Sequence, residues 1–181
     1  IKPDTIRITD FGLAPDTRLN AVQYVQKALE ECRKRSSAVL IFPKGRYDFW
    51  PQYATEKLYY ESNTDVIPLR RCAILIEGMK NLVIDCGGSD FIFHDRIQPF
   101  TVDKSSNITI RNVSVDWDIP LTAQAQITDV TNDYIDIAIN VLESPYTIEK
   151  GKLVFTGEGW KSRWNGVMEF DSTTKLVVPQ T

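Results

Sequence analysis

The sequence is poor in the residues that build covalent or metal-linked frameworks. It has three cysteines among 181 residues and a single histidine, His94. The number of cysteines is odd and no two of them have zinc-ligand spacing, which argues against a disulfide scaffold and against a zinc knuckle. We therefore expect the cysteines to be small buried hydrophobic residues. No metal ion and no cofactor is expected.

The sequence also lacks a cationic excess and a long apolar run. Its 21 basic and 24 acidic residues give a net charge of −3. Nucleic-acid-binding proteins usually have a clear positive excess, because phosphate contacts supply much of their affinity, so no nucleic-acid partner is expected. The apolar runs are only as long as strands, so no membrane span is expected. Phosphate-binding glycine loops, nucleophile elbows and His-Glu-x-x-His motifs do not occur.

The pattern of apolar and polar residues in the amino-terminal part predicts a strand, then a helix, then a second strand. Residues 5–12 alternate apolar and polar side chains, which is typical of a short strand followed by a turn. A helix is predicted next, with Asp16 or Thr17 as its N-cap and with the cations of residues 33–35 at its carboxyl end. Residues 38–42 form an apolar run that predicts a second strand. The predicted helix has an apolar stripe at Val22, Val25, Leu29 and Cys32.

A repeat follows in the middle of the chain. Residues 81–85 (NLVID) resemble residues 107–111 (NITIR) at a shift of 26 residues, and the same shift brings Phe91 opposite Trp117. A repeat of this length, made of short strands without a helix, is typical of the coils of a parallel β-helix. The asparagine that opens each segment suits a corner, because asparagine tolerates left-handed backbone. We therefore predict a mainly β fold, a parallel β-helix with an amino-terminal capping helix.

The pattern changes after Pro120. Irregular strand spacing and tight polar turns favour an inserted antiparallel β-subdomain, such as a small barrel, over further coils. We place the boundary near residues 119–122, which assigns the cap and first coils to residues 1–120 and the β-subdomain to residues 121–181. Five strands are predicted in this part, at residues 123–127, 134–142, 153–156, 167–170 and 176–178.

Two aspartates of the second repeat are candidates for chemistry. The alternation changes phase at residues 111–112, which leaves Ser114, Asp116 and Asp118 on the outer face of one strand. Residues two apart on a strand have Cα atoms roughly 6.5–7 Å apart, and inverting glycosidases need about 6.5–9.5 Å between their two carboxyl groups. The same aspartates could bind a calcium ion or could simply solvate an exposed strand.

His94 and Arg96 are further candidates, because they follow an apolar strand directly. The arginine could donate several hydrogen bonds to sugar hydroxyls, or it could form an ion pair with Asp95. Flat apolar faces for a sugar ring could come from Trp50, Trp160 and Trp164, with Tyr59 and Tyr60, although aromatic side chains more often belong to a core.

Five segments together resemble a known enzyme family. They are FPKGRYDFWP at residues 42–51, YESNT at 60–64, DFIFHDR at 90–96, NVSVDWD at 112–118 and MEFD at 168–171. DFG at residues 10–12, the predicted helix and IFPKGRY at 41–47 together look like the amino-terminal entry of pectate-lyase-like β-helix proteins. In order and over about residues 5–178, the chain resembles glycoside hydrolase family one hundred and ten, the bacterial exo-acting α-1,3-galactosidases.

The resemblance implies a right-handed parallel β-helix with small β-barrel insertions, and metal-independent, inverting hydrolysis of terminal α-1,3-linked galactose. Members of the family are much longer than this chain, and their catalytic aspartates lie in later coils, so no catalytic residue is assignable here. The chain departs from the family at Asp95, where glycine is usual, and at residues 119–120, where isoleucine-proline replaces asparagine-proline.

We therefore expect the amino-terminal portion of a secreted or periplasmic bacterial glycoside hydrolase, inactive on its own, whose partner is a glycan with terminal α-galactose. Asp116, Asp118, His94 and Arg96 are the expected substrate contacts. The chain begins at Ile1, so either a leader has been removed or the sequence is an excised piece. Two alternatives stay open: a non-catalytic carbohydrate-binding or tailspike-like β-helix, and a calcium-dependent polysaccharide lyase that uses the two aspartates as metal ligands.

Overall fold

A computed structural model describes residues 3–60 and 68–178. Most of the YESNT segment lies outside these residues. The chain divides into two compact units, Ile1–Leu121 and Thr122–Thr181, and each is described by itself. Strands predominate, and the described residues contain a single α-helix. This confirms a mainly β fold. No helix in the described ranges is long and apolar enough to cross a membrane.

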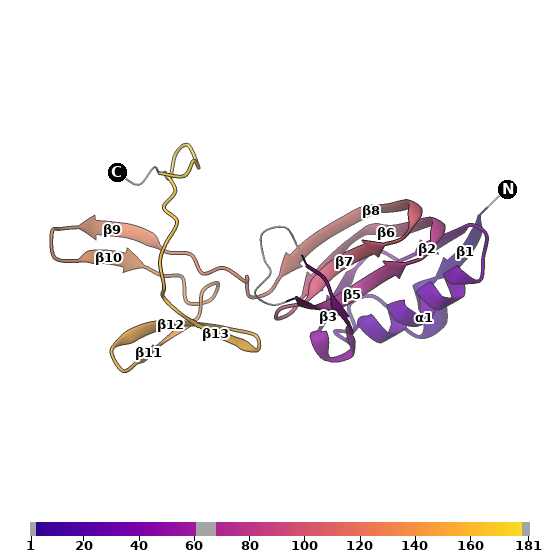
Figure 1. Ribbon diagram of the computed structural model, residues 1–181, viewed down its shortest axis with the longest axis horizontal. Coiled ribbons are helices and arrows are strands. Elements are labelled where there is room, and N and C mark those ends of the chain that lie inside the picture. The colour runs from indigo at the N-terminus through magenta and orange to yellow at the C-terminus, as the bar shows by residue number, and fades with distance from the viewer. Residues whose placement is uncertain (1–2, 61–67, 179–181) are drawn as a thin grey trace. The chain divides into compact units, whose positions relative to one another are not determined.

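The described part of the first unit contains two sheets and one α-helix (Figure 1). In the larger sheet, β2 and β3 pair with one edge of β6 and β8 pairs with the other, all in parallel, while β1 continues the sheet beyond β2. In the smaller sheet, β5 pairs with β4 antiparallel and with β7 in parallel. The elements are β1 (Asp4–Arg7), η1 (Ile8–Phe11), α1 (Val22–Arg33), β2 (Ala38–Ile41), β3 (Arg46–Phe49), η2 (Pro51–Tyr53), β4 (Thr55–Leu58), β5 (Leu69–Glu77), β6 (Lys80–Phe93), β7 (Gln98–Asp103) and β8 (Ser106–Trp117).

The predicted repeat is seen as strand pairing. Leu82 lies opposite Ile108 and Ile84 opposite Ile110, as the shift of 26 residues requires. The chain alternates between the two sheets from β5 to β8, and each of β7 and β8 pairs with the strand two before it. The asparagines that open the two segments, Asn81 and Asn107, both have φ 55, and the Asn107 amide donates to Asn81 Oδ1 at 2.8 Å. Two successive turns of chain therefore lie on each other in parallel.

The prediction that Phe91 meets Trp117 is wrong. The register between β6 and β8 shifts after Asp85, so that Ser89 faces Val113, Phe91 faces Val115 and Trp117 faces Phe93. The cause is a bulge on β6 made of Cys86, Gly87 and Gly88, which gives β6 two more residues than β8 between the paired positions. Both glycines have left-handed backbone, with φ 62 and φ 78, which glycine adopts without steric cost. The second half of the repeat is therefore offset by two residues.

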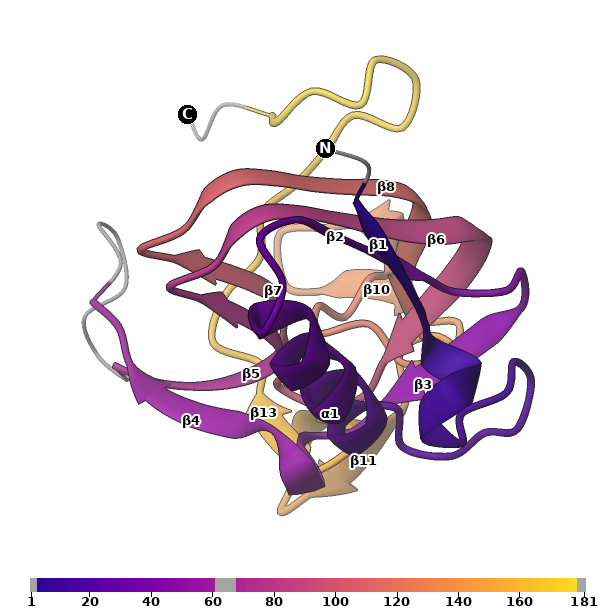
Figure 2. The ribbon, with the colours of Figure 1, turned by 90° about the vertical axis from the view of Figure 1, so that its right-hand side faces the viewer.

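Helix α1 buries the predicted stripe of Val22, Val25, Leu29 and Cys32 and packs against β1, β2 and β5 (Figure 2). Its predicted N-cap is wrong. The helix begins six residues after Asp16, and it is Asn20 whose Oδ1 accepts a hydrogen bond from the backbone N–H of Val22 at 3.2 Å. The Asp16 carboxylate instead accepts from the backbone N–H of Arg46 at 2.9 Å. The strand predicted within residues 5–12 ends at Arg7, and η1 follows from Ile8.

The core of the first unit lies between the helix and the two sheets. Its centre is an aromatic cluster in which ring centroids are 4.8–5.6 Å apart, mostly in edge-to-face or tilted contact. The cluster consists of Phe42, Tyr47, Phe49, Phe91 and Phe93, all of them buried. The three cysteines are free and buried, as predicted.

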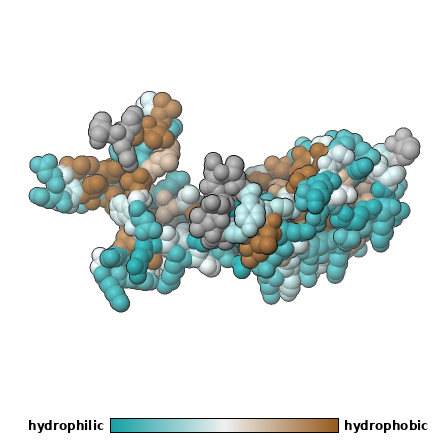
Figure 3. Space-filling model, viewed as in Figure 1, coloured by the Kyte–Doolittle hydropathy of each residue, from teal (hydrophilic) through white to brown (hydrophobic). Residues whose placement is uncertain are grey.

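The second unit is antiparallel, as predicted, but its strands differ from the prediction. They form a hairpin of β9 (Gln126–Val130) and β10 (Ile135–Ala138) and a sheet of β11 (Tyr146–Glu149), β12 (Lys152–Gly157) and β13 (Trp160–Arg163). The segments predicted at residues 167–170 and 176–178 share only an isolated bridge. No closed barrel is found among the described residues. Many apolar side chains are exposed here, including Leu142, Met168 and Leu176 (Figure 3).

Candidate functional site

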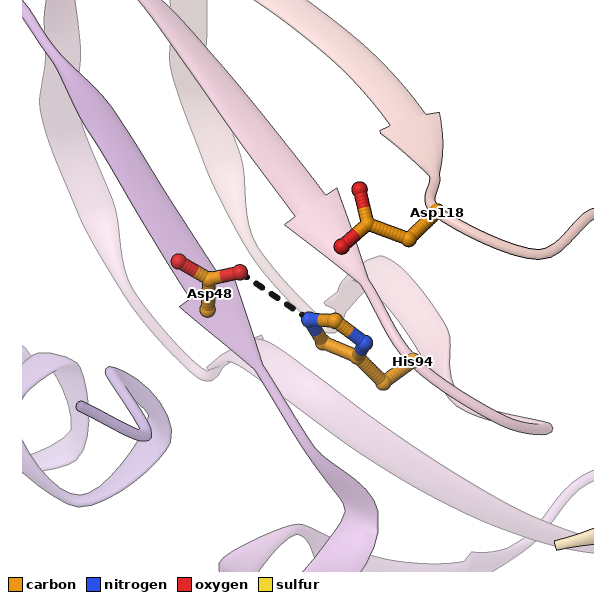
Figure 4. Close-up of side chains that lie close together, drawn as sticks. All are labelled: Asp48, His94 and Asp118. Carbon is orange, nitrogen blue, oxygen red and sulfur yellow. Dashed lines mark hydrogen bonds and ion pairs between the residues drawn. The ribbon is translucent and has the colours of Figure 1, made fainter. Parts of the chain in front are cut away.

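Three side chains that could take part in catalysis or in ligand binding meet where three parallel strands end. Asp48 lies on β3, His94 follows β6 directly and Asp118 follows β8 directly (Figure 4). The ligand atoms of all three lie within 4.8 Å of one another. The strand order explains this meeting, because β3 and β8 flank β6 in parallel and their carboxyl ends reach the same edge.

The bulge on β6 decides which residues meet. At the shift of 26 residues seen in the first half of the repeat, Asp118 would lie level with Ile92. The two extra residues of β6 reduce that shift, so that Asp116 takes the place opposite Ile92 and Asp118 comes level with His94. The site therefore depends on the bulge.

Arg46 joins the two carboxylates. Its Nε and Nη2 donate to Asp48 Oδ1 at 3.0 and 2.6 Å, and its Nη1 and Nη2 donate to Asp118 Oδ1 and Oδ2 at 3.0 and 2.6 Å. Nε also lies 3.2 Å from Asp48 Oδ2, so all four carboxylate oxygens accept from one guanidinium. The Asp48 side chain is fully buried, and a buried charge is stable only when it is paired and hydrogen-bonded.

His94 is held on two sides. Its Nε2 lies 3.0 Å from Asp48 Oδ1, and its ring stacks on Trp50 with centroids 3.9 Å apart and planes at 3°. Trp50 is fixed in turn by Asn20, whose Oδ1 accepts from the Trp50 N–H and whose Nδ2 donates to the Trp50 carbonyl, both at 3.2 Å. The imidazole is therefore buried and oriented. This geometry suits a positioning role more than direct contact with a ligand.

The pairing keeps both carboxylates charged. Hydrogen bonds from Arg46 lower the pKa of Asp118 below its ordinary value. Burial by itself would raise the pKa of Asp48, but the hydrogen bonds from Arg46 and His94 outweigh burial, and the pKa of Asp48 is lowered. The hydrogen bonds to Asp118 and Asp48 raise the pKa of Arg46 further. Since neither carboxyl group holds a proton near neutral pH, neither is suited to act as a general acid.

A cation could in principle use these donors, since Asp48, His94 and Asp118 offer two carboxylates and an imidazole. However, every oxygen of the pair already accepts from the Arg46 guanidinium. Arg18 adds a second positive charge, 3.5 Å from Asp48 Oδ1 and 3.8 Å from Asp118 Oδ2. A metal ion would have to displace Arg46 and enter beside Arg18, so the arrangement favours an arginine-neutralised network over a metal centre.

The four predicted contact residues do not form one group. His94 and Asp118 belong to the network, whereas Asp116 is exposed and its Oδ1 accepts from the neighbouring N–H of Trp117 at 2.8 Å. Arg96 is also exposed. Asp95, which stands where the family usually has glycine, has φ 55, and its carbonyl accepts from the Trp117 indole N–H at 3.2 Å. The left-handed backbone explains why glycine suits this position.

Sequence reasoning missed Asp48, Arg46 and Arg18. One signal was available, because Asp48 stands in the short strand RYDF between two large aromatic residues. An acidic residue inside an apolar strand needs a cationic partner when it is buried. The cation two residues before it would have been the first candidate, since both side chains point to the same face of the strand.

The network predicts a loss of stability in acid. The folded-state pKa values of Asp48 and Asp118 lie below the ordinary value of 3.8, so both groups stabilise the fold above that value. The free energy of unfolding should fall as the pH drops through about 3.8 towards the lowered folded-state pKa values. Urea unfolding measured between pH 7 and pH 2.5 checks this. Asp118→Asn should make the curve shallower below pH 4, and an unchanged slope would contradict the assignment.

The sequence is similar to those of known proteins. Residues 123–181 match the family described as GLAA-B beta-barrel domain I. The chain is 51% identical over 176 residues to alpha-1,3-galactosidase B of Bacteroides thetaiotaomicron, which covers 97% of this chain and 29% of that protein. It is 41% identical over 170 residues to alpha-1,3-galactosidase A of Shewanella woodyi, covering 92% of this chain and 28% of that protein. The chain thus spans less than a third of the length of these relatives.

Proposed function

The chain is a homologue of bacterial α-1,3-galactosidases over nearly its whole length, as its sequence predicted, and we propose that it is part of a glycoside hydrolase. We propose further that this enzyme removes terminal α-1,3-linked galactose from glycans, outside the cytoplasm of a bacterium. The observation that carries the proposal is the identity to galactosidases across both units. The chain would correspond to the amino-terminal portion of the enzyme.

For the fold, we propose a right-handed parallel β-helix with α1 as its cap. The proposal is supported by two sheets in which β5 and β7, and β6 and β8, are successive parallel layers. It is also supported by the asparagine pair at the corner and by the packing of α1 against β1, β2 and β5. The match of residues 123–181 to a β-barrel domain supports a barrel to which β9–β13 contribute.

For the chemistry, we propose inversion with two carboxyl groups, in which one activates a water and the other protonates the leaving oxygen. Asp118 does not suit the acid role, because hydrogen bonds from Arg46 keep its pKa low. The general acid would then have to be another carboxyl group. Within the present chain, we propose Asp118 as a contact to the sugar, since its side chain is 43% exposed, and His94 as a positioning residue. Asp116 and Arg96 remain proposed contacts on the exposed surface.

The test is hydrolysis of an α-1,3-linked galactosyl disaccharide by the protein at the full length of its relatives. We expect release of galactose whose first-formed anomer, followed by proton NMR, is inverted. The 181-residue chain alone should release none. Binding to glycans without release would favour the carbohydrate-binding alternative. A product absorbing in the ultraviolet, with activity lost to a chelator, would favour the lyase and contradict our proposal.

A further inference from the structure

The second unit has an open hollow whose lining combines two cations with an aromatic side chain. A hollow of about 440 Å³ opens in the second unit, where β12 begins and β13 ends. Ligand pockets in proteins typically have volumes of about 300–1,000 Å³, with a few polar groups that converge on an apolar wall. The hollow is large enough for one sugar ring. Its lining residues are Lys152, Leu153, Arg163, Trp164 and Asn165.

The strand register brings two of the lining cations to one face. Val154 lies opposite Arg163, and the N–H of Trp164 donates to the carbonyl of Leu153 at 3.2 Å, which continues the pairing by one residue. Lys152 and Val154 share a face because they are two residues apart. Lys152 and Arg163 are therefore diagonal neighbours on that face, roughly 7–8 Å apart.

One carboxylate, that of Glu149, is shared among three cations. Glu149 lies opposite Lys152 in the register and interacts electrostatically with Arg163, but its Oε1 is bonded to Lys161 Nζ at 2.9 Å. No ion pair of Lys152 or Arg163 occurs within residues 3–60 and 68–178. Residues 146–163 carry four basic and two acidic side chains in a chain whose net charge is −3. Like charges on neighbouring strands are unfavourable, and an anion in the hollow would neutralise them.

Trp164 supplies the apolar wall, because it lines the hollow and keeps 39% of its surface exposed. Aromatic side chains provide flat apolar faces, and such a face suits the carbon side of a sugar ring. Asn165 adds an amide that can donate to and accept from hydroxyl groups. The guanidinium of Arg163 is a planar fork that matches a carboxylate or a sulfate.

We propose that this hollow binds an anionic sugar residue, one that carries a carboxylate or a sulfate group. The ring lies on Trp164, the anionic group lies between Arg163 and Lys152, and Asn165 bonds a hydroxyl. The proposal rests on the proposed action on glycans, and it adds a binding subsite for a charged residue elsewhere on the same glycan. No bond is made or broken in this hollow.

The test is a titration of the 181-residue chain with three probes, namely galactose, galacturonic acid and galactose 6-sulfate, followed through the indole N–H resonances in NMR spectra. We expect at least one charged sugar to shift the Trp164 resonance saturably, and galactose to cause no such shift. The comparison of the two charged probes tells a carboxylate from a sulfate site.

Three variants distinguish binding by the cations of the hollow from a nonspecific attraction of the anion to the positive charge of the unit. Arg163→Gln and Lys152→Gln should each weaken binding of the charged sugar about tenfold, because each removes a charged hydrogen bond. Lys150→Gln is the matched control. It removes the same charge from the turn between β11 and β12, but Lys150 does not line the hollow, and binding should change less than twofold. Circular dichroism checks that each variant is folded.

Three results would overturn the proposal. Galactose could bind as well as the charged sugars, inorganic sulfate alone could bind as tightly as the sulfated sugar, or Lys150→Gln could weaken binding as much as Arg163→Gln. The galactosidase assay is independent of all three. Charged-sugar binding without hydrolysis by the full-length protein would contradict the proposed function alone, and hydrolysis without charged-sugar binding would contradict the subsite alone.

Discussion

Replacement of Arg46 by glutamine is expected to lower the free energy of unfolding at pH 7 by about 3–5 kcal/mol. The Asp48 side chain is fully buried, and Arg46 donates to both of its oxygens. Without the guanidinium, the buried carboxylate keeps two partners among the described residues, His94 at 3.0 Å and the largely exposed Arg18 at 3.5 Å. Neither replaces the contact of Arg46 with both oxygens, and loss of the main partner of a buried charge costs much more than the pair itself is worth. Urea or guanidinium unfolding of the chain measures the change.

Two further variants make this prediction specific. Arg111→Gln is the matched control, because Arg111 also bonds an aspartate, Asp85, but at an exposed position. It should cost no more than about 1 kcal/mol. Addition of Asp48→Asn to Arg46→Gln removes the buried charge and should restore part of the lost stability. An Arg46→Gln effect as small as that of Arg111→Gln would mean that the network does not stabilise the fold.

Gly87→Ala should cost clearly more stability than Gly88→Ala. Both glycines have left-handed backbone, and this conformation alone costs an ordinary residue about 1–2 kcal/mol. A Cβ atom at Gly87 would lie 2.6 Å from the backbone oxygen of Phe42, whereas nothing lies within 4 Å of one at Gly88. Relief of that overlap requires a backbone shift, which adds about 1–3 kcal/mol. Chemical unfolding of the two variants isolates the steric contribution.

The same pair of variants tests whether the bulge sets the site. The bulge brings Asp118 level with His94, so a change of the bulge should disturb the hydrogen bonds around Arg46. The His94 ring resonances should therefore move in Gly87→Ala and stay close to their original positions in Gly88→Ala. Equal costs and equal spectra for the two variants would show that the contact with Phe42 is unimportant.

The sequence predicted the features that depend on local pattern. The helix stripe at Val22, Val25 and Leu29 follows from helical spacing, and the stacking of Leu82 on Ile108 follows from the repeat. Those predictions hold because burial of apolar side chains is favourable, and their spacing along the sequence decides which of them share one face of a helix or strand. The start of the helix was missed because Asn20 and Asp16 both have side chains that can accept from a free backbone N–H near a helix start. Only the folded chain shows that Asp16 bonds Arg46 instead.

The second unit shows where local pattern fails. The apolar residues 167–170 are not a regular strand, whereas the polar segment of β13 is one. β13 is a strand because it continues from β12 through a short turn of two residues, Glu158 and Gly159, and pairs with it. Whether a polar segment of this kind forms a strand depends on the strand with which it pairs more than on its own composition.

The amino-acid sequence by itself determined the β-rich character, the period of the repeat, the buried free cysteines and the kinship to galactosidases. Only the tertiary structure decided that Asp118 lies beside His94 and that Arg46 neutralises the pair with Asp48. The physical reason is that the spacing of side chains decides only which neighbouring residues share a face. A bulge of two residues on one strand, by contrast, changes every pairing after it. A group of charges drawn from three strands is therefore set by register, and the bulge that sets it leaves no room for a Cβ at Gly87 beside the Phe42 carbonyl.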